Sequence, residues 1–157
     1  MRRASFFMMP ALAAFLLTAA CEGPQANADA SGQDTAGPLK EAINPGGGEI
    51  TTPFSPMVRS GNLIFMSGVI GRPGDGGAAQ ATRQAMDGVQ SRLEAIDATM
   101  EDLVKCTVFM VDMDDYGAMN EVYAGYFEGD PPARSALAVR ALPAQATIEV
   151  ECIAAVP

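Results

Sequence analysis

The sequence predicts an α+β domain with the element order ββαβαββ, in which two helices cover one face of a mixed β-sheet. Two observations lead to this prediction. Short runs rich in β-branched and aromatic residues alternate along the chain with two segments whose apolar residues recur every three to four positions. The chain has 157 residues, which leaves room for one ordinary domain of roughly 100–150 residues.

The first two strands are predicted to form a hairpin at the start of a domain that begins at Glu49. Met57–Arg59 and the apolar run Asn62–Ile70 are the strands, and Ser60–Asn62 is the turn between them. The glycine-rich segment Gly71–Gly77 that follows is predicted to be a loop by its composition.

A long amphipathic helix is predicted over 79–100, with the next strand at Val104–Val111. The helix would make about six turns. The strand alternates apolar and mixed positions, as a half-buried strand does. The apolar positions that give the helical spacing are Ala79, Met86, Val89, Leu93, Ile96 and Met100.

A second helix and two further strands complete the order. Asp114 or Asp115 can cap the helix, and the segment Gly129–Pro132 is expected to end it. The strands are predicted at Ser135–Arg140 and Thr147–Ala155.

One face of the predicted sheet lacks a cover. If Ile148, Val150 and Cys152 point at the helices, their neighbours along the strand point away. The uncovered face is then half apolar, and no element remains in the chain to pack on it, so another subunit is its natural cover. Its members on two strands are Lys105, Thr107, Phe109, Val111, Thr147, Glu149, Glu151 and Ile153.

Charge and composition exclude several classes of function. Ten basic and nineteen acidic residues give a net charge of −9, and removal of Arg2 and Arg3 with a leader gives 8 − 19 = −11. Such an acidic chain is a poor ligand for nucleic acid, whose binding needs clustered Lys and Arg. The chain has no histidine, so Ser-His, Cys-His and His-metal sites are excluded.

The N-terminus has the pattern of an export signal. A basic start and a short apolar run precede Leu17–Cys21, which resembles a bacterial lipobox. We expect a signal peptide at 1–20, lipidation of Cys21 and a disordered tether at 21–48. The protein would then be exported and lipid-anchored to a bacterial membrane, on the periplasmic or cell-envelope side. The alternative is a soluble secreted product cut nearby.

The two other cysteines, Cys106 and Cys152, lie inside alternating apolar runs. A disulfide is possible between them in an exported protein, but the sequence does not fix their distance. Buried core thiols are the favoured interpretation.

Several stretches, taken in order, resemble the RidA (YjgF-like) family of imine/enamine deaminases over about Thr51 to the C-terminus. The combination is more specific than any single stretch. The stretches are Pro53–Pro56 with Val58-Arg59, Gly61–Gly68, Thr107–Asp112, Met119–Tyr123, Pro132–Ser135, Ala141–Pro143 and Ile148–Ala154.

The resemblance implies a chorismate-mutase-like fold and a homotrimer with active sites in the clefts between subunits. It implies hydrolysis of 2-imino acids and their enamine tautomers to 2-keto acids and ammonia, without metal or cofactor. Arg134 would grip the substrate carboxylate with its planar fork, and Glu149 would position and activate water. Phe54, Gly68 and Asn120 would line the substrate site.

Two positions depart from the family pattern: Ala136 stands where the deaminases usually carry cysteine, and Val69 stands where they carry glutamine. These departures, and an export compartment poor in enamines, leave a second hypothesis open. The chain could be a non-catalytic protein that binds small carboxylates. A third hypothesis is a structural envelope protein, which would neither bind nor turn over such acids.

Overall fold

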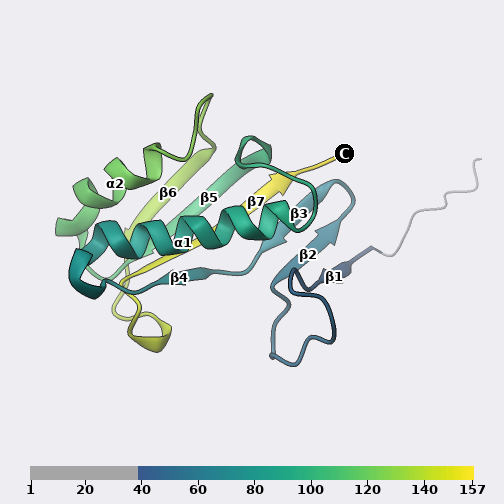
Figure 1. Ribbon diagram of the computed structural model, residues 1–157, viewed down its shortest axis with the longest axis horizontal. Coiled ribbons are helices and arrows are strands. Elements are labelled where there is room, and N and C mark those ends of the chain that lie inside the picture. Colours follow the sequence, from purple (N-terminus) through teal and green to yellow (C-terminus); the bar gives the residue numbers. More distant parts are fainter. Residues whose placement is uncertain (1–38) are drawn as a thin grey trace, which may run out of the picture. The chain divides into compact units, whose positions relative to one another are not determined.

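The computed structural model describes residues 39–157, and these form one mixed sheet with two α-helices (Figure 1). The strands follow the order β1-β2-β3-β7-β5-β6, and β4 also pairs with β7. Only β5 and β6 run parallel; the other pairs are antiparallel. The elements are β1 (Glu41–Ile43), β2 (Met57–Ser60), β3 (Leu63–Met66), β4 (Val69–Gly71), α1 (Gly77–Glu94), β5 (Leu103–Met110), α2 (Tyr116–Ala124), β6 (Ala133–Ala138) and β7 (Ile148–Ala155).

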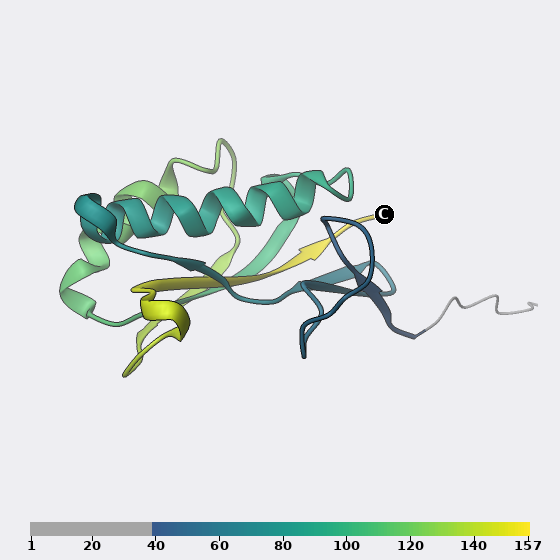
Figure 2. The same cartoon turned by 60° about the horizontal axis from the view of Figure 1, so that its bottom comes forward.

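Both helices lie on the same face of the sheet, as predicted (Figure 2). The core forms between this face and α1, because the inward positions of β5 and β7 are fully or almost fully buried. The predicted alternation of β7 is confirmed: Ile148 and Val150 are 0% exposed, whereas Glu151 is exposed. Within residues 39–157, no helix combines the length and the hydrophobicity that a membrane span requires.

The sheet begins earlier than the predicted start at Glu49. β1 pairs with β2 through Glu41 opposite Arg59 and Ile43 opposite Met57. Part of the predicted tether is therefore the edge strand of the domain. Sequence composition missed it because three residues are too few to show an alternating pattern. The predicted signal peptide, the predicted lipidation of Cys21 and the first part of the predicted tether lie outside the described residues.

The predicted strand Asn62–Ile70 is two strands. β3 and β4 both pair with β7, through Phe65 opposite Ile153 and Val69 opposite Val150. Three residues, Met66–Gly68, thus face two residues of β7. An extra residue of this kind is a β-bulge, which bends a strand and removes backbone groups from the ladder.

Both helices end earlier than predicted. α1 stops at Glu94 instead of Met100, because Asp97 takes a left-handed conformation (φ 56°) and the amide of Ala98 bonds to the carbonyl of Leu93. α2 ends at Ala124, well before Gly129.

The start of α2 also differs from the prediction that Asp114 or Asp115 caps it. A 3₁₀ turn over Met113–Asp115 leads into the helix, and the side chain of Asp112 accepts a hydrogen bond from the amide of Asp114. The capping carboxylate therefore precedes the turn.

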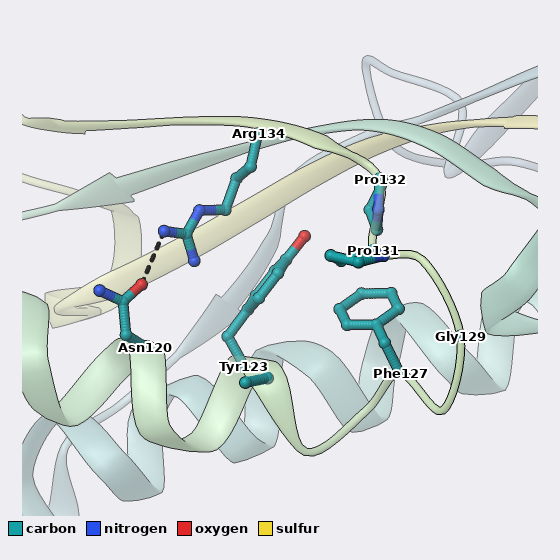
Figure 3. Close-up of a pocket in the computed structure, with 8 residues that line it drawn as sticks. Asn120, Tyr123, Phe127, Gly129, Pro131, Pro132 and Arg134 are labelled. Atoms are coloured by element: carbon teal, nitrogen blue, oxygen red, sulfur yellow. Dashed lines mark hydrogen bonds between the residues drawn. The ribbon is translucent and has the colours of Figure 1, made fainter.

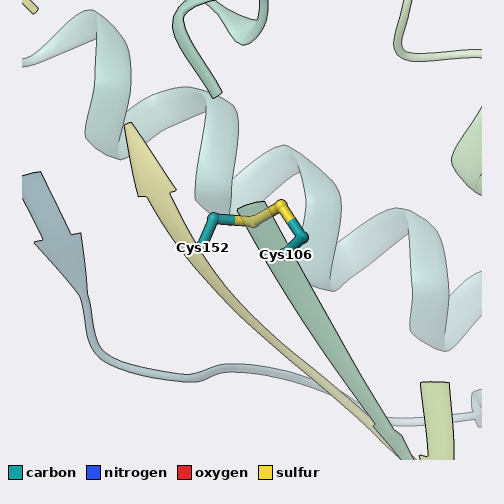
Figure 4. Close-up of a disulfide and its surroundings, with 2 residues drawn as sticks. All are labelled: Cys106 and Cys152. Atoms are coloured by element: carbon teal, nitrogen blue, oxygen red, sulfur yellow. A yellow bond between two sulfur atoms is a disulfide. The ribbon is translucent and has the colours of Figure 1, made fainter. Parts of the chain in front are cut away.

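Cys106 and Cys152 form a disulfide, so the prediction of free core thiols was wrong (Figure 4). The two residues lie directly opposite each other on β5 and β7, with their Cα atoms 4.1 Å apart. Cross-strand register, which the sequence alone does not reveal, brought them together. Both side chains belong to the core, at 0% and 2% exposure.

The second face of the sheet remains uncovered by the described residues, as the sequence indicated (Figure 2). Phe65 and Leu137 on this face are 42% and 41% exposed. A shallow hollow on it is lined by Phe65, Met66, Lys105, Thr107, Glu151, Cys152 and Ile153.

Candidate functional site

Arg134 is held between the edge strand β6 and helix α2 (Figure 3). Its Nη2 donates to Oδ1 of Asn120 at 2.6 Å and to the hydroxyl of Tyr116 at 3.2 Å. Its guanidinium also lies 4.7 Å from the ring centroid of Tyr123, a cation–π distance. None of these partners is an acid, so the full positive charge remains available to an anionic ligand.

The cavity beside Arg134 is mostly apolar. It has a volume of about 490 Å³ and is lined by Asn120, Tyr123, Ala124, Phe127, Gly129, Pro131, Pro132 and Arg134. The ring of Tyr123 separates Arg134 from Phe127 (Figure 3). One cation in an apolar cleft is the usual design of a site for a small organic anion.

The two tyrosines beside Arg134 differ in burial, and their pKa values shift in opposite directions. The hydroxyl of Tyr123 is buried without a hydrogen-bond partner among the described residues. Burial raises the pKa of Tyr123 to about 12, and the charge of Arg134 opposes that shift. The hydrogen bond with Asn120 and the charge of Arg134 lower the pKa of the exposed Tyr116. Tyr123 therefore stays a neutral hydroxyl beside the guanidinium.

Glu149 lies in a separate cavity of about 350 Å³. The carboxylate of Glu149 lies over Gly68, where a Cβ would be 1.8 Å from its Oε1. Burial raises the pKa of Glu149, and the negative charge of Glu151 adds to the shift. The cavity is lined by Phe54, Ser67, Gly68, Ile70, Arg92, Pro143 and Glu149.

Arg134 and Glu149 belong to opposite faces of the sheet. Arg134 aligns with Cys106 on β5, whose side chain points at the helices. Glu149 aligns with Phe109, which has the opposite parity and points to the uncovered face. One chain therefore cannot direct both side chains at the same substrate.

The sequence-predicted site residues thus form two groups. Asn120 contacts Arg134, whereas Phe54 and Gly68 line the cavity of Glu149. Sequence reasoning missed Tyr116 and Tyr123, which it assigned only to the helix. Their spacing of four and three residues from Asn120 could have placed them on its helical face.

Sequence reasoning also missed Arg92, although it lies three residues after Val89 and four before Ile96, at the edge of the apolar stripe of the predicted helix. Arg92 turns towards Ser67 and lines the cavity of Glu149. The spacing does not by itself signal the contact with Ser67.

The two departures from the family pattern lie in different places. Val69 points at α1, since its Cγ1 would be 2.5 Å from a Cβ on Gly88, and so it faces away from Glu149. Ala136 lies two residues after Arg134, packs against the core and faces the helices with it.

The chain matches the family model described as Endoribonuclease L-PSP over residues 48–156. It is 39% identical over 108 residues to a RutC family protein of Pyrococcus horikoshii, covering 65% of this chain and 86% of that protein. It is 35% identical over 108 residues to the human protein named 2-iminobutanoate/2-iminopropanoate deaminase, covering 65% of this chain and 79% of that protein.

Solved structures show the same fold. The YjgF gene product of E. coli superposes with a TM-score of 0.65 at 32% identity, covering 73% of this chain and 98% of that one. RidA from an Antarctic Psychrobacter superposes with a TM-score of 0.64 at 27% identity, over 73% of this chain and 98% of that one.

Proposed function

Because the chain belongs to the Endoribonuclease L-PSP family, we propose that it hydrolyses 2-imino acids and their enamine tautomers to 2-keto acids and ammonia. Relatives at 35–36% identity carry the name 2-iminobutanoate/2-iminopropanoate deaminase. The observation that carries the proposal is Arg134, a cation with no acidic partner among residues 39–157, held at an apolar cavity by Asn120 and Tyr116.

Arg134 binds the substrate carboxylate in this proposal. A guanidinium donates two parallel N–H bonds to a carboxylate and stays charged at any physiological pH. Asn120 and Tyr116 restrict the rotation of the guanidinium, so that little side-chain entropy is lost when the acid binds. Imino acids of several side chains would bind in this way, because the carboxylate is common to all of them.

Glu149 is the general base. It takes a proton from water while the water oxygen bonds to the imine carbon and the C=N π electrons move to nitrogen. Glu149 returns this proton to the nitrogen, which gives a carbinolamine. The carbinolamine then collapses: Glu149 takes the hydroxyl proton and passes it to the amino nitrogen, the C=O bond forms, the C–N bond breaks, and the nitrogen departs as ammonia. A carboxylate with a raised pKa suits this step, because it accepts a proton more readily than a fully solvated one.

We further propose that the site forms between subunits of a homotrimer. Arg134 and Glu149 belong to opposite faces of one sheet, so they can share a substrate only if they come from different subunits. The uncovered face with exposed Phe65 and Leu137 gives such an assembly an apolar contact surface. Phe54 and Gly68 would then line the Glu149 side of each cleft.

The proposed reaction is tested by generating imino acids in place with an amino-acid oxidase and trapping them with semicarbazide. Wild-type protein should speed the loss of the free imine and so lower the amount that semicarbazide traps, and Arg134→Ala should not, while remaining trimeric. Arg140→Ala is the matched control, since it removes an exposed arginine of the same region. Wild-type-like turnover by Arg134→Ala would refute the mechanism. Tight keto-acid binding without turnover would instead favour the non-catalytic alternative.

We also propose that the protein is exported and anchored by a lipid on Cys21. The Cys106–Cys152 disulfide supports this, because structural disulfides persist in oxidising compartments outside the cytosol. A labelled fatty acid should be incorporated into the wild type and not into Cys21→Ala, and the variant should leave the membrane fraction. Equal membrane association of the two proteins would exclude the anchor.

A further inference from the structure

Arg92 connects helix α1 to the bulge between β3 and β4. Its Nη1 donates a hydrogen bond to the carbonyl of Ser67 and approaches the carbonyl of Pro56 at 3.5 Å. Ser67 lines the cavity of Glu149, and so does Arg92 itself. The guanidinium therefore bridges a helix of the covered face and a segment that borders the proposed water-activating group.

The bulge needs such a bond because its backbone groups have left the sheet ladder. The amide of Ser67 donates to the carbonyl of Pro56 at 3.0 Å, and its hydroxyl donates to the carbonyl of Ser55 at 2.7 Å. Those two bonds satisfy the donors of Ser67. Its carbonyl oxygen accepts from Arg92, which completes the hydrogen bonding of the residue.

A guanidinium is a costly group at this position. Arg92 is partly buried, and burial alone lowers its pKa, with no carboxylate of the described residues contributing. An apolar side chain would fill the same space without the cost of removing a charge from water. What the guanidinium adds is the hydrogen bond that it donates to the carbonyl of Ser67 in the bulge.

The bulge is in direct contact with Glu149. Gly68 follows Ser67 and lies against the carboxylate, so closely that no Cβ fits between them. A shift of the Ser67 backbone therefore changes where the carboxylate rests. In a site that must hold water against a carbon atom, a displacement of about 1 Å can lower the rate on the order of 100-fold.

We propose that Arg92 is a positioning residue for the hydrolytic step: by bonding to Ser67 it fixes Gly68, and through Gly68 it fixes the carboxylate of Glu149. The expected effect of Arg92 on kcat rests on the proposed function. Its expected effect on the position of Ser67 and Gly68 rests on the geometry of the bulge alone. Arg92 does not touch the substrate carboxylate in this account, because Arg134 binds that group.

The test compares Arg92→Leu and Arg92→Lys with the wild type in the full trimeric protein. Arg92→Leu should lower kcat about 10- to 100-fold and change KM less than about threefold, since only water activation is disturbed. Arg92→Lys can still donate to a carbonyl and should recover part of the loss. Arg83→Leu, an exposed arginine on the same helix, is the matched control and should behave as wild type.

Amide hydrogen exchange provides a readout that does not depend on turnover. Exchange at Ser67 should accelerate in Arg92→Leu, while α1 and β5 keep the wild-type rates. If no protein variant, wild type included, hydrolyses imines, the proposed function fails and this exchange measurement still decides the role of Arg92. Unchanged exchange at Ser67 would overturn the inference. So would a loss of kcat no larger than the fraction of the variant that is unfolded.

Discussion

The carboxylate of Glu149 occupies the place where a side chain on Gly68 would begin: a Cβ on Gly68 would be 1.8 Å from Oε1 and 2.6 Å from Cδ of Glu149. Residue 68 must therefore be glycine for Glu149 to keep its position. The requirement comes from contact alone, since the φ angle of Gly68 is not in the left-handed region. The backbone of the bulge and the proposed general base are thus in direct contact.

Gly68→Ala should consequently lower imine turnover by about 10-fold or more while the proposed trimer persists, because the new methyl group displaces the carboxylate. Steady-state kinetics on imines generated in place will measure the loss. Gly117→Ala is the matched control: a Cβ there meets nothing within 4 Å, and Ala favours the helix over Gly. Equal activity of Gly68→Ala and the wild type would show that the position of Glu149 does not matter.

Two inactive variants should restore activity to each other if each site combines residues from two subunits. Arg134→Ala and Glu149→Gln are each expected to be inactive alone. In a mixed trimer one of the three clefts receives both intact residues, so random mixing at equal amounts should return about one quarter of wild-type activity.

Unfolding the two variants together, refolding them and assaying the mixture makes the measurement. Each variant refolded alone is the control. A mixture as inactive as its components would mean that Arg134 and Glu149 do not share a cleft.

The acid limb of the pH–rate profile should move when Glu151 is neutralised. The negative charge of Glu151 disfavours ionised Glu149 and so raises its pKa, second to the effect of burial. Removing that charge lowers the pKa of Glu149 and leaves more of the ionised base at low pH. Glu151→Gln should therefore shift the rise of kcat/KM to lower pH.

The matched control for this shift is Glu94→Gln, which removes an exposed carboxylate from α1, on the other side of the sheet. Its profile should match the wild type. A limb that moves to higher pH in Glu151→Gln, or does not move, would contradict the assignment of Glu149 as the base.

The Cys106–Cys152 disulfide should stabilise the fold against unfolding. It joins β5 to β7 across a sequence separation of 46 residues, and closing a loop of that size in the unfolded chain is worth about 2–4 kcal/mol. Urea unfolding of the oxidised and the fully reduced wild type will compare the two states without changing any side chain. The double variant Cys106→Ala/Cys152→Ala should have the unfolding midpoint of the reduced wild type, and reductant should not change that midpoint. Equal unfolding midpoints for the two wild-type forms would refute a stabilising role.

The elements with a long periodic pattern were predictable. The alternation in β5 and β7 and the apolar stripe of α1 gave their type and buried faces, and the residues left over gave the uncovered face. The predicted ends of elements were wrong where the conformation of one residue ended the element, such as the left-handed Asp97 after α1. The short strand β1 was not predicted for another reason, since only its pairing with β2 makes it a strand.

Part of the candidate site could likewise be predicted from the sequence, and part could not. The Pro-Pro-Ala-Arg-Ser stretch that contains Arg134, and the position of Glu149 in its strand, could be read from the sequence. The partners that restrict Arg134 could be only partly foreseen, because Tyr116, Asn120 and Tyr123 share a helix face while the neighbouring strand decides which of them reach the guanidinium.

By itself the sequence determined the class of the fold, the parity of each long strand and the acidic, histidine-free chemistry available to the protein. Those properties depend on residue type and on spacing within one element, which the chain carries locally. Tertiary structure alone decided the Cys106–Cys152 bond, the bulge at Ser67, the reach of Arg92 and the placement of Arg134 and Glu149 on opposite faces. The disulfide, the bulge and the two faces depend on the register between strands distant in sequence, and a shift of one residue in that register would undo them. The reach of Arg92 depends on how α1 packs over the bulge.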